Sequence, residues 1–174
     1  MTTGDLYNTL VGHGAGASIT SGNRNVFMGT SAGDGHDTET HNLGIGVASL
    51  GGSIAGGEYN VAVGNYTLDA LTSGDQNVAI GYAAGGALQG GGNNVFIGNS
   101  AGTAQTSASS NVLIGGDAGA AITTGGNNTF VGYGIAGTDA THSNAIGLGH
   151  NFAVVGDRFS FGKQNNVVTN GFTL

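Results

Sequence analysis

The side chains of this 174-residue chain that could do chemistry include five histidines, ten acidic residues and five tyrosines. Histidine can transfer protons or bind a metal, and two carboxylates can hydrolyse a glycoside. The histidines are His13, His36, His41, His142 and His150. They are scattered and stand in no recurring arrangement with a serine and an acid, so we expect solvated turn residues. In a three-fold assembly, one histidine per chain could still hold a cation on the axis.

The remaining candidates are equally isolated. Asp37 and Glu39 lie two residues apart in one irregular stretch, and nothing marks them as a catalytic pair. Asp34 and Asp117 do not recur in the register that a calcium-binding glycine-rich repeat needs. No phosphate-binding loop of the Gly-x-x-x-x-Gly-Lys-Ser/Thr type is present. We therefore predict no catalytic residue, no metal ligand, no cofactor and no enzyme activity.

A five-residue motif recurs along most of the chain, and its fixed period is typical of a solenoid or array. Each copy begins with asparagine, continues with a short apolar run and ends with glycine, as in Asn77-Val78-Ala79-Ile80-Gly81. The eight full copies are bounded by Asn8 and Gly12, Asn25 and Gly29, Asn42 and Gly46, Asn60 and Gly64, Asn77 and Gly81, Asn94 and Gly98, Asn111 and Gly115, and Asn128 and Gly132. The asparagines are 17 residues apart, except for one spacing of 18 between Asn42 and Asn60.

The motif predicts a half-buried strand, because positions 1 and 3 after the asparagine are mostly branched and apolar. Position 2 varies among Ala, Phe, Leu, Gly and Thr, and the glycine at position 4 predicts a sharp bend. Small residues at positions 7 and 8 and an apolar residue at position 11, such as Leu71, Leu88 and Ile122, predict a weaker second strand. Ser, Thr, Gly and Asn then close the unit with a turn. Stacked units of this kind bury a continuous apolar face that one unit cannot bury alone.

The asparagine column allows two interpretations. The amides could hydrogen-bond along the stack and hold the bends, or they could form a row that binds a ligand. We favour the structural role, because no second polar column accompanies the asparagines. The exposed bend tyrosines Tyr66, Tyr82 and Tyr133 could stack on sugars, although surface tyrosines usually have no such role.

Composition narrows the possible partners. The chain has 37 glycines, no proline and no cysteine, and only 7% of its residues are charged, with a net charge of −7. Low charge suits stacked strands, because a charge in a repeated column would face its own copy. Three basic residues are too few for a phosphate-binding stripe, so we expect no nucleic-acid partner. No apolar run is long enough for a membrane helix, and we expect no membrane insertion.

Two regions follow from the repeats. Residues 1–143 are predicted to form the 17-residue repeats, and residues 144–174 an irregular C-terminal β segment or cap. A shortened ninth copy is expected at Asn144-Ala145-Ile146-Gly147, 16 residues after Asn128, and the tail Lys163–Gly171 is expected to be a strand with turns. The chain begins within a repeat, so we expect it to be part of a longer fibre or to be covered there by another subunit.

The repeat resembles those of bacteriophage tail-fibre and tailspike proteins, and it is similar to the head repeats of trimeric autotransporter adhesins. The nearest match to the adhesin heads is Ser143-Asn144-Ala145-Ile146-Gly147. The segment Val154–Gly162 resembles the one preceding the self-cleaving chaperone of phage fibres. The resemblance implies a parallel homotrimer, built as a β-solenoid or β-roll or as an interwound triple β-helix. In such a trimer, Phe27, Phe96 and Phe130 at position 2 could face neighbouring chains.

The function expected from the resemblance is a stiff, trimeric structural segment of a phage tail fibre or tailspike, located in the virion and involved in host attachment. Its receptor would be a host cell-surface glycan or protein. The alternatives are the head of a trimeric adhesin on a bacterial cell surface and a trimeric cement protein that decorates a capsid. An ice-binding solenoid is less consistent with the sequence, because Thr20, Thr72 and Thr123 skip units.

Overall fold

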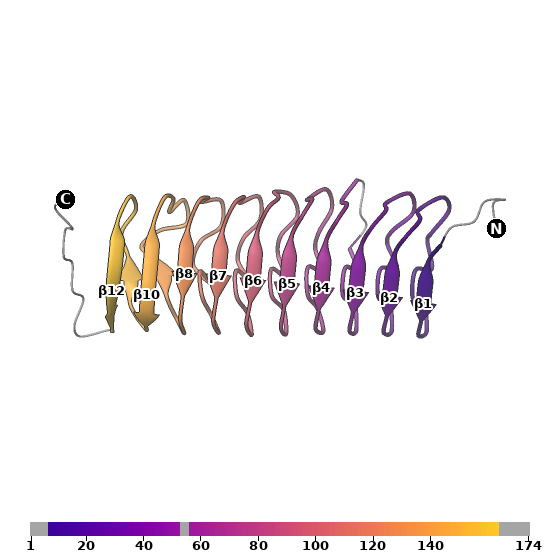
Figure 1. The fold of residues 1–174 in the computed structure, drawn as a ribbon, viewed down its shortest axis with the longest axis horizontal. Helices are drawn as coiled ribbons and strands as arrows, with labels where there is room; N and C mark the ends of the chain where they lie inside the picture. Colours follow the sequence, from indigo (N-terminus) through magenta and orange to yellow (C-terminus); the bar gives the residue numbers. More distant parts are fainter. Residues whose placement is uncertain (1–6, 53–55, 164–174) are drawn as a thin grey trace.

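The chain winds into a parallel β-solenoid, in which short strands stack into one long sheet (Figure 1). The computed structural model describes residues 7–52 and 56–163. Within these residues there are strands, turns and bends and no helix, so the all-β prediction is confirmed. The strands are β1 (Thr9–Val11), β2 (Val26–Met28), β3 (Leu43–Ile45), β4 (Val61–Val63), β5 (Val78–Ile80), β6 (Val95–Ile97), β7 (Val112–Ile114), β8 (Thr129–Val131), β9 (Ala136–Gly137), β10 (Ile146–His150), β11 (Ala153–Val154) and β12 (Phe159–Lys163).

Ten strands form the main sheet in the order β1-β2-β3-β4-β5-β6-β7-β8-β10-β12, and β9 and β11 form a second, two-stranded sheet. Each strand pairs in parallel with the equivalent residues of the next coil, as Val78 does with Val95. Strands of one chain therefore pair with one another. Of the two predicted architectures, the structure has the β-solenoid and not the interwound triple β-helix. The 18-residue spacing keeps this register, since Leu43 pairs with Val61. The added residue lies in the connection between β3 and β4, which includes residues 53–55, outside the described part.

The glycine at position 4 is where the backbone of neighbouring coils comes closest. Gly81 has a φ of 131°, and a Cβ built on it would lie 2.5 Å from the carbonyl oxygen of Gly98. A residue with an L side chain is strained at this φ, and its Cβ would push the next coil away. Both restrictions account for the glycine that ends each full copy of the motif.

The predicted second strand is wrong for the full repeats, where turns follow the bend instead. Residues at positions 6 and 8 adopt left-handed conformations, as Ala83 (φ 51°) and Gly85 (φ 60°) do, and these break an extended strand. The stretch is still bonded from coil to coil, because the amide of Gly85 donates to the carbonyl of Ala101 at 2.9 Å. The short strand pair β9 and β11 occurs on this side only near the C-terminal end.

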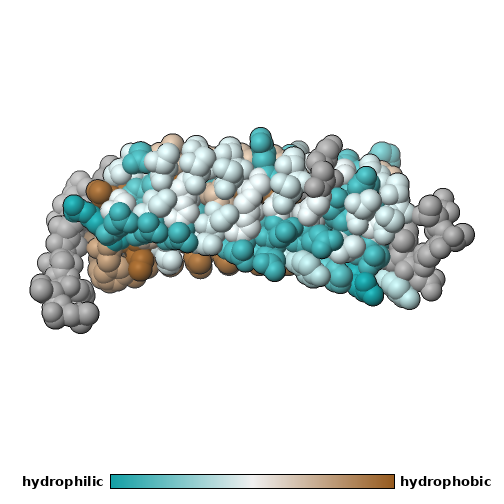
Figure 2. Space-filling view, turned by 90° about the horizontal axis from the view of Figure 1, so that it is seen from above, coloured by the Kyte–Doolittle hydropathy of each residue, from teal (hydrophilic) through white to brown (hydrophobic). Residues whose placement is uncertain are grey.

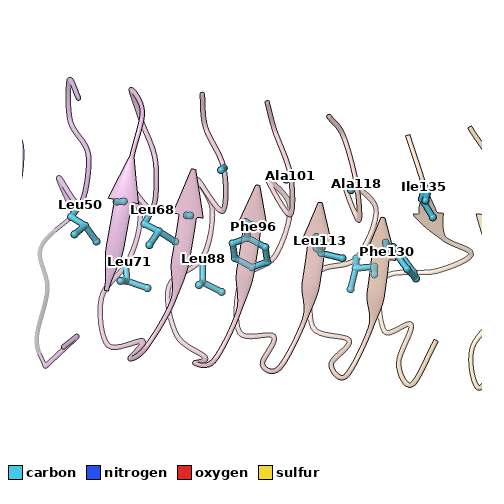
Figure 3. Close-up of a cluster of buried hydrophobic side chains, with 14 of the residues drawn as sticks. Leu50, Leu68, Leu71, Leu88, Phe96, Ala101, Leu113, Ala118, Phe130 and Ile135 are labelled. Atoms are coloured by element: carbon cyan, nitrogen blue, oxygen red, sulfur yellow. The ribbon is translucent and has the colours of Figure 1, made fainter. Parts of the chain in front are cut away.

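The expectation that position 2 faces neighbouring chains is also wrong. Phe27, Phe96 and Phe130 have 0% exposed surface, and Phe96 and Phe130 can be seen inside the coil in Figure 3. Phe27 lies against Gly33 and Phe96 against Gly102, both at position 8. The apolar residues predicted at position 11 line the same interior, and Leu71, Leu88 and Ile122 are buried. The sequence does not show which face of a strand is buried when both faces are apolar. The alternation of side chains fits burial of either face.

The interior volume is shared between positions 2 and 8. Where position 2 is Phe96, position 8 is Gly102, and a Cβ on Gly102 would lie 2.7 Å from the phenylalanine ring. Where position 2 is Ala62, position 8 is the buried Leu68. Large and small residues thus exchange places between the two sides of these two coils. The coil between them has Ala79 at position 2 and Gly85 at position 8, and Phe96 and Leu68 of its neighbours lie against Gly85, so the core stays close-packed.

The C-terminal coils continue the sheet past the predicted ninth copy, whose alignment is wrong by one residue. Ile146 pairs with Thr129, so Ala145, and not Asn144, occupies the asparagine position 17 residues after Asn128. The next coil is shorter, because Ile146 pairs with Phe159. The boundary between residues 143 and 144 stays a prediction. Of the tail strand expected over Lys163–Gly171, only Lys163, the last residue of β12, is described, and the rest lies outside the described residues. The described part holds no helix long and apolar enough to cross a membrane.

Candidate functional site

The asparagine column forms a continuous ladder inside the solenoid. The side-chain oxygen of Asn77 accepts a hydrogen bond from the backbone amide of Asn94 at 3.1 Å, and the side-chain nitrogen of Asn94 also donates to it at 2.9 Å. The same oxygen-to-backbone bond joins every successive pair from Asn8 to Asn128, with distances of 2.8–3.1 Å. Each coil is therefore linked to the next by a bond of the same type at an equivalent place.

Each amide also closes its own coil. The side-chain nitrogen of Asn77 donates to the carbonyl of Gly91 at 3.1 Å, in the turn that ends the same repeat. Asn60 bonds Gly74 in the same way at 2.8 Å. Buried amides satisfied in this manner contribute about 1 kcal/mol per hydrogen bond, and a lost partner costs more than the bond itself contributes. The side chain thus fixes both the closure and the stacking of a 17-residue coil.

The ladder is not an accessible row. From Asn25 to Asn128, every asparagine of the column is at most 2% exposed. This burial and the bonds to backbone groups support the structural role and leave no free amide face for a ligand. The ladder ends at Ala145, whose backbone amide bonds Asn128 at 3.1 Å and whose side chain cannot accept a bond from the next coil.

Two histidines expected in solvent are instead buried. His36 has 0% exposed surface, and His142 has 3%. The prediction that His36 is a solvated turn residue is wrong. His36 stands at position 11, the apolar column, and this register is the signal from which its burial could have been predicted. Burial lowers the pKa of His36 to about 4, against the opposing effect of Glu39, Asp34 and Asp37. Burial also lowers the pKa of His142.

The buried Glu39 has a structural environment. Its carboxylate accepts hydrogen bonds from the backbone amides of Asp37 at 2.9 Å, Thr38 at 3.2 Å and Gly56 at 3.0 Å. The last of these bonds comes from the following coil. Glu39 therefore holds the irregular turn together and joins it to the following coil. The absence of a catalytic role for Asp37 and Glu39 stays a prediction.

The tyrosines at the bends are exposed, as expected. Tyr66 and Tyr82 make an edge-to-face contact with ring centroids 5.8 Å apart, and Tyr133 stacks on His150 at 5.5 Å. A glycan could stack on such rings, and this remains a prediction. The hydroxyl of Thr72 donates to the carbonyl of the next coil, at Gln89, over 2.8 Å.

The outward face of the sheet is the surface that the sequence reasoning missed. Positions 1 and 3 point away from the core along all ten strands, and they are apolar except for Thr9 and Thr129. Met28 is 40% exposed and Phe161 43%. The members of this outward face are Thr9, Val11, Val26, Met28, Leu43, Ile45, Val61, Val63, Val78, Ile80, Val95, Ile97, Val112, Ile114, Thr129, Val131, Ile146, Leu148, Phe159 and Phe161.

Part of this hydrophobic surface can be seen on one side of the rod. Brown atoms follow the lower margin of Figure 2, mainly toward the C-terminal end. The acidic residues lie outside these strands, so positions 1 and 3 of the outward face carry no acidic side chain. Within residues 7–52 and 56–163, no group of three or more histidines and acids could hold a metal ion. A cation site shared between chains stays a prediction.

No model of a known protein family matches the chain, and no curated protein or solved structure is detectably similar to it.

Proposed function

We propose that this protein is a structural segment of a trimeric phage tail fibre or tailspike, in which it acts as a stiff support during host attachment. The observation that carries the proposal is the unbroken ladder of buried amides from Asn8 to Asn128, which bonds each coil to the next. A rod that is bonded identically at every layer resists bending and local opening. This property suits a part that must hold a receptor-binding tip at a distance from the particle.

The assignment to a phage fibre rests on the resemblance of the Asn-Val-Ala-Ile-Gly repeat, together with the segment Val154–Gly162. The solenoid supports a mechanical role in general, and the repeat type directs that role to a fibre. Three parallel chains would give a thicker and stiffer rod than one. The receptor would be a glycan or a protein on the host surface, and the exposed Tyr133 and His150 pair is the stacked aromatic surface that a sugar could contact.

Antibodies raised against the chain test the proposal when they are applied to virus particles and cells that express the gene. Electron microscopy should show the label on tail fibres or spikes, and the antibody should block adsorption to the host. Label on a bacterial envelope would replace the proposal with an adhesin head, and label spread over the capsid would replace it with a cement protein. Antibodies absorbed with the purified chain provide the control.

A further inference from the structure

We infer that the outward face of the sheet is where parallel copies of this chain pack against one another, in register along the rod. The inference rests on the proposed trimer and identifies the surface that forms it. This surface differs from the one expected from the sequence, since the phenylalanines at position 2 are enclosed within each coil.

The size of the outward face is the first argument. Ten strands about 4.8 Å apart, each about 10 Å long, give a flat footprint of roughly 450 Å². Apolar patches of this size are among the largest on monomeric proteins, where the usual maximum is about 300–600 Å². One partner buries roughly 800 Å² in a stable interface, so the outward face alone would supply about half of that area.

Charge is the second argument. The chain carries a net charge of −7, so two copies repel each other wherever their acids come close. The outward face is where copies can meet without burying a charge, because its side chains are aliphatic or aromatic apart from Thr9 and Thr129. Burying an unpaired charge would cost several kcal/mol, whereas burying valine and isoleucine is favourable.

The periodicity of the outward face indicates that its partner is a second copy of this chain. The outward face is a row of branched side chains that repeats at every strand, and successive rows are fixed by the register Val61, Val78 and Val95. A second copy of the chain has the same repeat, so its rows match along the whole length when the chains are parallel. A lipid surface or an unrelated apolar segment has no such period and could match only locally.

The first experiment adds charge to the outward face. The double variant I80K/I97K places two lysines at neighbouring position 3 sites of β5 and β6. The control S73K/Q89K adds the same charge to exposed turns of adjacent coils. Multi-angle light scattering should give a trimer mass for the wild type and the control, and a monomer for I80K/I97K with an unchanged far-UV spectrum. An I80K/I97K protein that keeps the trimer mass would overturn the inference and leave the proposed fibre role intact.

Cross-linking tests the direction of packing without adding charge, and it uses the absence of native cysteine. M28C lies on the outward face near the N-terminal end, so parallel copies bring identical residues together. A short bismaleimide should join M28C chains efficiently, while S21C, an exposed residue just before the same strand, should give little product. Equal product from both variants would contradict packing through this face. A wild type that stays monomeric would also remove the trimer, while the antibody labelling still decides the fibre assignment.

Discussion

The ring of His36 packs edge-on against Phe27 inside the solenoid, with ring centroids 4.8 Å apart. Among residues 7–52 and 56–163, neither imidazole nitrogen has a hydrogen-bond partner. Burial of this ring favours the neutral imidazole, because it lowers the pKa of His36. The burial of His36 in the apolar column therefore makes the stability of the fold depend on pH.

Stability should fall as the pH is lowered from 6.5 to about 4. In this window the unfolded chain binds a proton at His36 while the folded chain does not, because burial lowers the folded pKa from 6.5 to about 4. The contribution is fully present above pH 6.5 and is lost by about pH 4. It amounts to about 3 kcal/mol, and His142 acts in the same direction. Urea denaturation at several pH values measures the loss.

The variant H36L separates this contribution from that of the acids. Leucine is the residue found at position 11 in Leu71 and Leu88, so it should fit the column and flatten the pH dependence. H13L, at an exposed histidine, should leave the profile as it is in the wild type. An H36L protein with the full wild-type dependence would show that His36 is not its source.

Removing one amide from the ladder should destabilise the fold strongly. N77A leaves the buried backbone amide of Asn94 without its acceptor and the carbonyl of Gly91 without its donor. The unsatisfied groups should cost about 3 kcal/mol in total. S73A, at an exposed position of the neighbouring turn, should change the free energy of unfolding by less than about 0.5 kcal/mol. Thermal and urea unfolding of the three proteins compare these values, and an N77A protein as stable as S73A would contradict the role of the ladder.

Two glycines allow a matched test of the close approach between coils. G81A places a methyl group at a φ of 131° and 2.5 Å from the oxygen of Gly98, so it should cost more than about 2 kcal/mol. G90A meets only the hydroxyl of Ser73 at 3.5 Å and should be nearly neutral. The difference in urea midpoint between the two variants gives the answer. Equal midpoints would mean that neighbouring coils can move apart without a penalty.

The exchange of volume between positions 2 and 8 predicts a coupled pair of substitutions. A62F alone overfills its coil and L68G alone leaves a cavity, and each should cost about 2–4 kcal/mol. The double variant A62F/L68G reproduces the arrangement of Phe96 with Gly102, and Leu68 already has a φ of 49° that glycine adopts freely. It should recover about 2 kcal/mol relative to the sum of the single losses. A double-mutant cycle from urea unfolding measures the coupling, and strictly additive losses would disprove the exchange.

The sequence by itself determined the repeat, the stacking direction and the members of the asparagine column, because a period of 17 residues places identical side chains above one another. The motif also predicted the bend at Gly81, where only a residue without Cβ fits. The sequence could not decide which face of each strand is buried. Both faces are apolar, and the alternation of side chains fits burial of either one. The tertiary structure decided that Phe96 lies inside and Ile97 outside. It also placed Ala145 instead of Asn144 at the end of the ladder, because strand pairing, and not the nearest asparagine, sets the register of the last coils.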